Sequence, residues 1–254
     1  MKKYLFCVFI SLLMSVQLFA QITEGYITYR HISQKKTQED LERLENKVRK
    51  QVSDPMLQEK VLREIRKSAN KQHIFYYGLT FTDKSAVYRS LADNQMMGKM
   101  GITATYSDYQ QSIVISQGYI FEKAFLIKEK QDTIAWELVD STRTLMPFEV
   151  RMAKATVDSM EVIAWYSPDI PVSGGPDVWH GLPGVILEVY KPDGSAIKFD
   201  KFTTVIEKDV LEVPTKGKKL ASRAAFDQKL QEAMERLNER ARNGEKIKLG
   251  SGGN

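Results

Sequence analysis

Alternation of apolar and polar residues with a period of two recurs along most of this chain, in short runs separated by polar breaks. The run "HIFYYGLTFT" at 73–82, for example, places Phe75, Tyr77, Leu79 and Phe81 on one face. Such alternation is typical of a half-buried β-strand. The breaks are too short for crossover helices, so consecutive strands must be joined by turns. The sequence therefore predicts an α+β fold on a curved antiparallel β-sheet meander, in one version resembling a half-barrel.

Further runs have the same strand character. Between the runs at 185–190 and 196–206, the stretch "KPDGS" predicts a hairpin turn, because proline presets φ and glycine accepts a positive φ. The runs are "ITEGYITYRHI" (22–32), "AVYRS" (86–90), "SIVISQ" (112–117), "YIFEKAFLIKE" (119–129), "TIAWELVD" (133–140), "MAKATV" (152–157), "MEVIAWYS" (160–167), "VILEVY" (185–190) and "AIKFDKFTTVI" (196–206).

A helical insert is predicted near the N-terminus, over about 38–71. Thr37 with Asp40 forms a capping signature, and Asp54 followed by Pro55 reads as a second helix start. One apolar stripe follows at helical spacing and is expected to pack against the rest of the fold, since helices of this length are marginal alone. The stripe comprises Leu41, Leu44, Val48, Leu57, Val61 and Ile65.

A second helix is predicted at the C-terminus. Ser222 is a suitable N-cap, and the helix is expected to end near Gly244. Residues 245–254 include "GSGGN" and are expected to form a flexible tail. The apolar positions of this helix are Phe226, Leu230, Met234 and Leu237.

The first twenty residues have the pattern of a secretory signal peptide. Lys2 and Lys3 precede an apolar run, and Ala20 ends it. Leu18 stands where a small residue is usual, so an uncleaved anchor is the alternative. Cleavage would leave one α+β domain over 21–244, exported to the periplasm or the exterior and not transmembrane after signal cleavage.

Charge and cysteine content exclude several classes of protein. Without Lys2 and Lys3 the formal net charge falls from +5 to +3, with no basic stripe, so nucleic acid is not an expected partner. The single cysteine, Cys7, lies within the predicted signal, so the mature chain has no disulfide or thiolate ligand. Three methionines in "NQMMGKM" would suit Cu(I), but methionine more often fills core gaps. We expect no metal and no cofactor.

The segment "SPDIPVSGGPDVWHGLPG" at 167–184 is too rich in proline for a central strand. It predicts a stiff loop whose last turn directs Val185 into the sheet. Gly184 is expected to adopt a backbone conformation that a side chain would penalise, so the segment is interpreted first as a structural corner. The residues assigned to this corner are Pro168, Pro171, Gly175, Pro176, Gly181, Leu182, Pro183 and Gly184.

Aromatic residues beside this loop suggest a second role for it. Trp165, Tyr166, Trp179 and His180 could form the floor of a binding site for an apolar or extended ligand. The alternative is that they pack in the core. His180 with nearby carboxylates could also serve a hydrolase or metal-dependent enzyme, but no second histidine lies at ligand spacing.

The stretch "AWYSPDIPVSGGPDVWHGLPGVILEVY" resembles the signature of the GLPGLI family of exported bacterial proteins. Earlier stretches, including "GYITYRH" and "LTFTDKSAVY", match that family in type and order. Two positions depart from it: Val185 replaces the second leucine of the motif, and Met152 replaces a usual cysteine before "KAT". The family has no established activity, so the resemblance implies export and architecture but no reaction.

These observations favour a non-enzymatic binding or accessory protein of the cell envelope. Its partner would be an apolar ligand or another envelope protein, and the aromatic loop would contact it. The alternative is an exported hydrolase or metal-dependent enzyme centred on His180.

Overall fold

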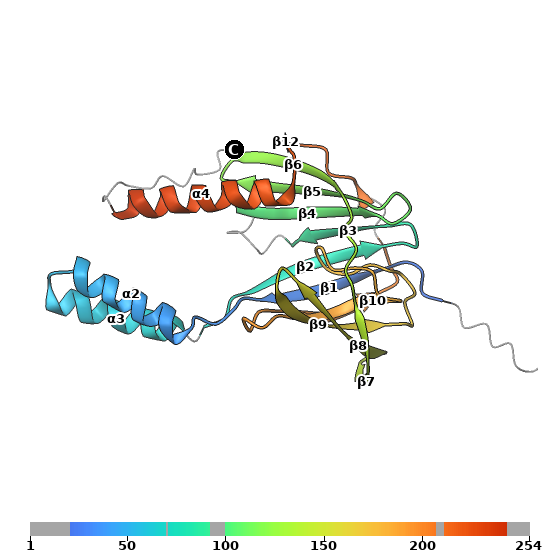
Figure 1. The fold of residues 1–254 in the computed structure, drawn as a ribbon, viewed down its shortest axis with the longest axis horizontal. Helices are drawn as coiled ribbons and strands as arrows, with labels where there is room; N and C mark the ends of the chain where they lie inside the picture. Colours follow the sequence, from blue (N-terminus) through green and yellow to red (C-terminus); the bar gives the residue numbers. More distant parts are fainter. Residues whose placement is uncertain (1–20, 70, 92–99, 207–210, 243–254) are drawn as a thin grey trace, which may run out of the picture.

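A computed structural model of the chain describes residues 21–69, 71–91, 100–206 and 211–242. The predictions for residues 1–20, for Met96 and Met97, and for the tail at 245–254 lie outside the described residues. The described part forms one large, open, mixed β-sheet with helices at its side (Figure 1). Its strands are β1 (Gly25–Ile32), β2 (Ile74–Phe81), β3 (Ser85–Ser90), β4 (Met100–Asp108), β5 (Ile113–Ile120), β6 (Lys123–Lys130), β7 (Glu137–Leu145), β8 (Phe148–Val157), β9 (Met160–Ser167), β10 (Val185–Tyr190), β11 (Ala196–Thr203) and β12 (Lys218–Leu220).

The sheet consists of two antiparallel runs joined at β1. Its order is β12-β6-β5-β4-β3-β2-β1-β11-β10-β9-β8-β7, so β1 pairs with both β2 and β11. The connection between β6 and β7 runs from near one edge of the sheet to the opposite edge, because β6 lies next to the edge strand β12 and β7 is the other edge strand. The predicted simple meander is therefore incomplete, and β12 pairs with β6 in parallel.

Three strands differ most from the sequence prediction. The run "TIAWELVD" was expected to be a strand, but β7 begins only at Glu137, and Ile134 and Trp136 pack against the core from the preceding connection. The strands β4 and β12 were missed: Gly101 interrupts the apolar alternation of β4, and β12 has only three residues. At the predicted "KPDGS" hairpin, Lys191 N–H donates to Ser195 O at 3.1 Å, and Gly194 has a φ of 78°.

The core has two parts. The larger cluster joins residues of β1 to β3 and β8 to β11, and the loop at 168–184 adds Ile170, Val172 and Leu182 to it. The smaller cluster lies under α4 (Arg223–Arg242), where Phe226 is fully buried and meets Phe125 edge to face at 5.9 Å. Ser222 caps α4 by accepting from Ala225 N–H at 3.1 Å.

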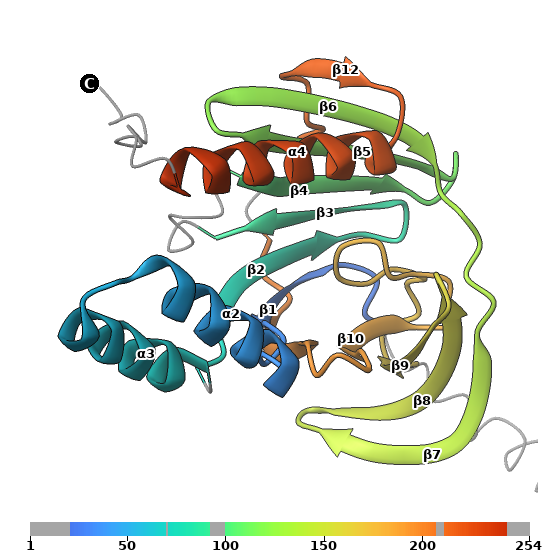
Figure 2. The same ribbon diagram turned by 60° about the vertical axis from the view of Figure 1, so that its left-hand side comes forward.

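The helical insert forms a hairpin of α2 (Gln38–Gln51) and α3 (Pro55–Ala69). The two helices pack against each other and project beyond the sheet (Figure 2). The expectation that one apolar stripe of the insert packs against the rest of the fold is therefore wrong. Leu62, which lies outside the predicted stripe, is only 1% exposed, whereas Leu57 within the stripe is 52% exposed. No helix among the described residues is long and apolar enough to span a bilayer.

Candidate functional site

The loop at 168–184 is held to the start of β10 by backbone hydrogen bonds. Val185 N–H donates to Ile170 O, and Ile186 N–H donates to Gly174 O, both at 2.9 Å. Gly184 has a φ of 149°, in a region that side chains disfavour. This arrangement makes the loop an ordered part of the fold, and it places Asp177 on one side of a cavity.

The four predicted binding residues do not form one surface. Trp165, Tyr166 and Trp179 are 7%, 3% and 6% exposed and belong to the larger core cluster. Trp136 packs beside Trp179 with ring centroids 6.2 Å apart, and its Nε1–H donates to His180 O at 2.7 Å. The Nδ1 atom of His180 is hydrogen-bonded to Val178 O at 2.8 Å. Trp165, Tyr166 and Trp179 therefore pack in the core, which was the alternative to a binding role. None of the four residues lines the cavity described next.

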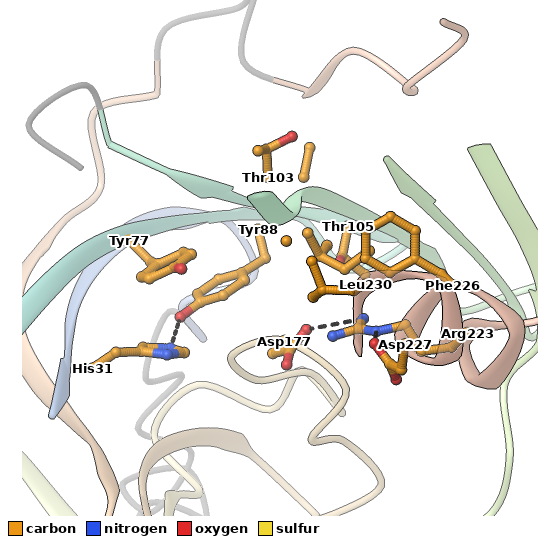
Figure 3. Close-up of a pocket in the computed structure, with 13 residues that line it drawn as sticks. His31, Tyr77, Tyr88, Thr103, Thr105, Asp177, Arg223, Phe226, Asp227 and Leu230 are labelled. Atoms are coloured by element: carbon orange, nitrogen blue, oxygen red, sulfur yellow. Dashed lines mark hydrogen bonds and ion pairs between the residues drawn. The ribbon is translucent and has the colours of Figure 1, made fainter. Parts of the chain in front are cut away.

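A cavity of about 230 Å³ lies between the sheet, this loop and α4 (Figure 3). It is lined by residues of β1 to β4, by Asp177 from the loop, and by the first two turns of α4. Three of the lining residues, His31, Asp177 and Arg223, are more than 40 residues apart in the sequence, so sequence spacing could not reveal the site. The lining residues are His31, Tyr77, Tyr88, Gly101, Ile102, Thr103, Ala104, Thr105, Asp177, Arg223, Phe226, Asp227 and Leu230.

One wall of the cavity is aromatic. The rings of Tyr77 and Tyr88 are stacked with centroids 5.1 Å apart and planes 6° from parallel, and the ring of His31 lies 4.2 Å from that of Tyr77. His31 Nε2 is hydrogen-bonded to the Tyr88 hydroxyl. Burial lowers the pKa of His31 to about 4 and raises the pKa of Tyr77 to about 12. Burial also raises the pKa of Tyr88, so all three rings are uncharged at pH 7.

The opposite wall carries charge. Arg223 forms ion pairs with Asp177 and Asp227, in which Nη1 and Nε lie 3.6 Å from the respective Oδ1 atoms. These two nitrogens expose almost no surface, and the distances are too long for hydrogen bonds. Figure 3 shows Asp177 between the His31–Tyr88 pair and Arg223. The cavity thus presents guanidinium donors, carboxylate acceptors and aromatic rings to one small volume.

A second polar cluster lies away from the cavity, at strands β7 and β10. Arg143 forms an ion pair with Glu188, whose Oε2 also accepts from the Tyr190 hydroxyl at 2.7 Å. The Arg143 guanidinium lies 4.0 Å from the centroid of the Trp165 ring. Glu188 is only 5% exposed, although it lies in the strand that leads into the "KPDGS" turn. Its burial between paired strands makes this cluster a structural feature.

Among the described residues, no group of three or more His, Cys, Asp or Glu side chains lies close enough to hold a metal ion. The sequence patterns place His31 in a predicted strand and Asp177 in the proline-rich loop, and they single out no role for Arg223. The available signal was their side-chain chemistry, without any indication that they meet.

Comparison with known proteins gives a match of one segment to a family model and a likeness of fold. The family model "Protein of unknown function (Porph_ging)" matches residues 110–188, a segment that includes Asp177 but ends before α4. No curated protein matches the chain.

Two solved structures of PNGF-II, in the C2 and P21 space groups, resemble the chain at a TM-score of 0.56 and 10% sequence identity. Each covers 83% of this chain, but the chain spans only about a third of PNGF-II, 33% and 34% respectively. At this identity the likeness concerns the fold alone.

Proposed function

We propose that the chain is a non-enzymatic binding protein of the cell envelope that holds a small polar ligand in the cavity between the sheet and α4. The observation that carries this proposal is the cavity of about 230 Å³ itself, which combines the charged side chains of Asp177, Arg223 and Asp227 with stacked aromatic rings. A pocket with a few convergent polar groups is the usual setting of a binding site.

The proposal keeps the proline- and glycine-rich loop as part of the site but changes its role. Asp177, rather than the neighbouring aromatic side chains, contributes to the cavity. The charged wall favours a polar ligand over the apolar one expected from the sequence, because an apolar ligand would remove water from these charged side chains without replacing its hydrogen bonds. In this proposal the sheet is curved like a half-barrel, which brings the loop opposite α4.

The cellular location is part of the same proposal. The basic start, the apolar run and Ala20 support export with cleavage after residue 20. The resemblance of the 164–190 stretch to the GLPGLI signature supports membership of that exported family. Intact-mass measurement of secreted protein tests this: retention of residues 1–20 would contradict cleavage.

The alternative of a hydrolase or metal-dependent enzyme centred on His180 has no specific observation in its favour. His180 lies outside the cavity, and its Nδ1 atom is engaged with a backbone carbonyl. The cavity therefore remains the better candidate for the functional site.

Native mass spectrometry of the exported protein tests ligand binding. Leu230→Trp should fill the cavity from α4 and abolish any co-purifying small molecule. Met234→Trp is the matched control, because Met234 lies one turn further along α4, is 42% exposed and does not line the cavity. Equal ligand retention by the two variants would exclude the cavity as the binding site.

A further inference from the structure

The helix α3 carries apolar side chains on two of its sides. Leu62 and Ala69 are its buried residues, whereas Leu57 is 52% exposed. Successive residues of an α-helix are about 100° apart, so Leu57 lies about 140° around the helix from Leu62. The α2–α3 hairpin projects beyond the sheet (Figures 1 and 2), so the sheet does not cover this second apolar side.

A groove runs along the second side between two rows of side chains, one apolar and one polar. Within each row the residues are four positions apart, and rows with this spacing are the ridges that pack into the grooves of another helix. All the lining residues belong to α3, so no other described segment contributes a side chain to the groove. The apolar row is Leu57, Val61 and Ile65, and the polar row is Lys60, Glu64 and Ser68.

The apolar row of a second α3 fits this groove. Leu57 and Ile65 lie equally far along the chain on either side of Val61, so an antiparallel copy presents the same row in reverse order. A two-fold axis beside Val61 sets Leu57 of each copy against Ile65 of the other. The surface is therefore self-complementary, as a two-fold symmetric interface requires.

The charges favour the same orientation. The two-fold rotation keeps both polar rows on one side of the interface and makes them antiparallel, so that Lys60 of each copy lies beside Glu64 of the other. A parallel pairing would place the polar rows on opposite sides and form neither contact. Glu64 already pairs with Lys67 of its own chain at 3.1 Å, but both side chains are exposed, so this pair is weak and does not prevent a second contact.

We propose that two copies of the chain associate antiparallel through the groove on α3, which brings two α2–α3 hairpins together. This surface shares no residue with the cavity, so the proposal is independent of ligand binding. The helix has 15 residues and is about 22 Å long, so one of its faces buries less than the roughly 800 Å² per partner of a standard interface. The dimer is therefore weak, and its population rises with protein concentration.

Sedimentation velocity of the exported protein tests this inference between about 1 μM and about 1 mM, a range that spans weak affinities. The parent should shift from monomer to dimer over this range, and Val61→Glu should stay monomeric because it places a charge in the centre of the groove. Met56→Glu is the matched control and should dimerise like the parent, because Met56 is 84% exposed on the same helix and does not line the groove. Circular dichroism verifies that the helices of each variant are formed.

Charge reversal tests the orientation without altering the apolar row. Lys60→Glu and Glu64→Lys each oppose like charges at both contacts, so either variant alone should self-associate about five- to thirtyfold more weakly than the parent. An equimolar mixture of the two variants should associate again, because each acidic polar row then faces a basic one. Fluorescent labelling of one variant identifies the mixed dimer.

Three results would overturn the proposal. The first is a parent that stays monomeric at every concentration, in which case α3 is covered by another molecule or by none. The second is a Val61→Glu variant that dimerises as well as the parent. The third is a mixture of the charge-reversed variants that associates no better than either variant alone.

Discussion

Gly184 and Ser167 are in such close backbone contact that a Cβ atom at position 184 would lie 2.1 Å from the carbonyl oxygen of Ser167. The same glycine has a φ of 149°. Val185 pairs with Ser167 in the β9–β10 ladder, so the contact lies where the loop enters the sheet. The glycine is required by both sterics and backbone geometry, and it sets how the loop that carries Asp177 meets β10.

Gly184→Ala should lower the free energy of unfolding by about 1–3 kcal/mol, because the added Cβ forces the two backbones apart. Gly194→Ala is the matched control: its φ is 78°, but nothing lies within 4 Å of the added Cβ. Urea denaturation should show the larger loss for Gly184→Ala. Equal losses would mean that backbone conformation alone, without the contact to Ser167, limits position 184.

Arg143→Ala should destabilise the fold by about 1–3 kcal/mol, because it leaves the buried carboxylate of Glu188 without its ion pair. The Arg143 side chain is 37% exposed, so solvent reduces this cost. Arg43→Ala removes the exposed pair with Glu39 and should cost less than about 0.5 kcal/mol. Similar chemical-denaturation midpoints for the two variants would contradict a structural role for the Arg143–Glu188 pair.

Acidification should destabilise the fold through His31. Burial lowers the folded-state pKa of His31 from 6.5 to about 4, against the opposing effect of Asp177 and with a smaller contribution from Lys191. Between pH 6.5 and 4 the unfolded chain therefore binds more protons than the folded chain, so stability falls as the pH falls and levels off below about 4. The free energy of unfolding should fall by up to about 3 kcal/mol over this pH range.

His31→Gln should remove that component while retaining a polar side chain beside Tyr88. The test is the thermal midpoint of both proteins at intervals from pH 7 to pH 4. A variant whose midpoint falls as steeply as that of the parent would assign the acid sensitivity to other groups.

Leu62→Ala should destabilise the α2–α3 hairpin by about 2–5 kcal/mol, since Leu62 is 1% exposed. Leu57→Ala, at a 52% exposed position on the same helix, should cost far less. Because the hairpin projects from the sheet, the loss is expected in the hydrogen exchange of residues 38–69 rather than in that of the strands. Equal protection of the helices in both variants would contradict this packing.

Most of the strand pattern could be predicted from local sequence, although β4 and β12 were missed. Alternation such as Phe75, Tyr77, Leu79 and Phe81 reports which residues share a face, and "KPDGS" reports a turn, because both depend on a few adjacent residues. The strong need for glycine at position 184 was also readable, since the proline-rich loop runs directly into a β-branched strand. Only the contact with Ser167 gives its physical cause.

Only the tertiary structure decided three features: the pairing of β1 with β11, the projection of the α2–α3 hairpin beyond the sheet, and the position of the cavity. Long stretches of chain separate His31, Asp177 and Arg223, and no local pattern specifies that these three residues line one cavity. The tryptophans Trp165 and Trp179 are equally apolar in a core or at a binding surface, so their sequence context could not distinguish the two. Burial and the location of charge around a cavity depend on long-range packing, which arises only when the whole sheet has formed.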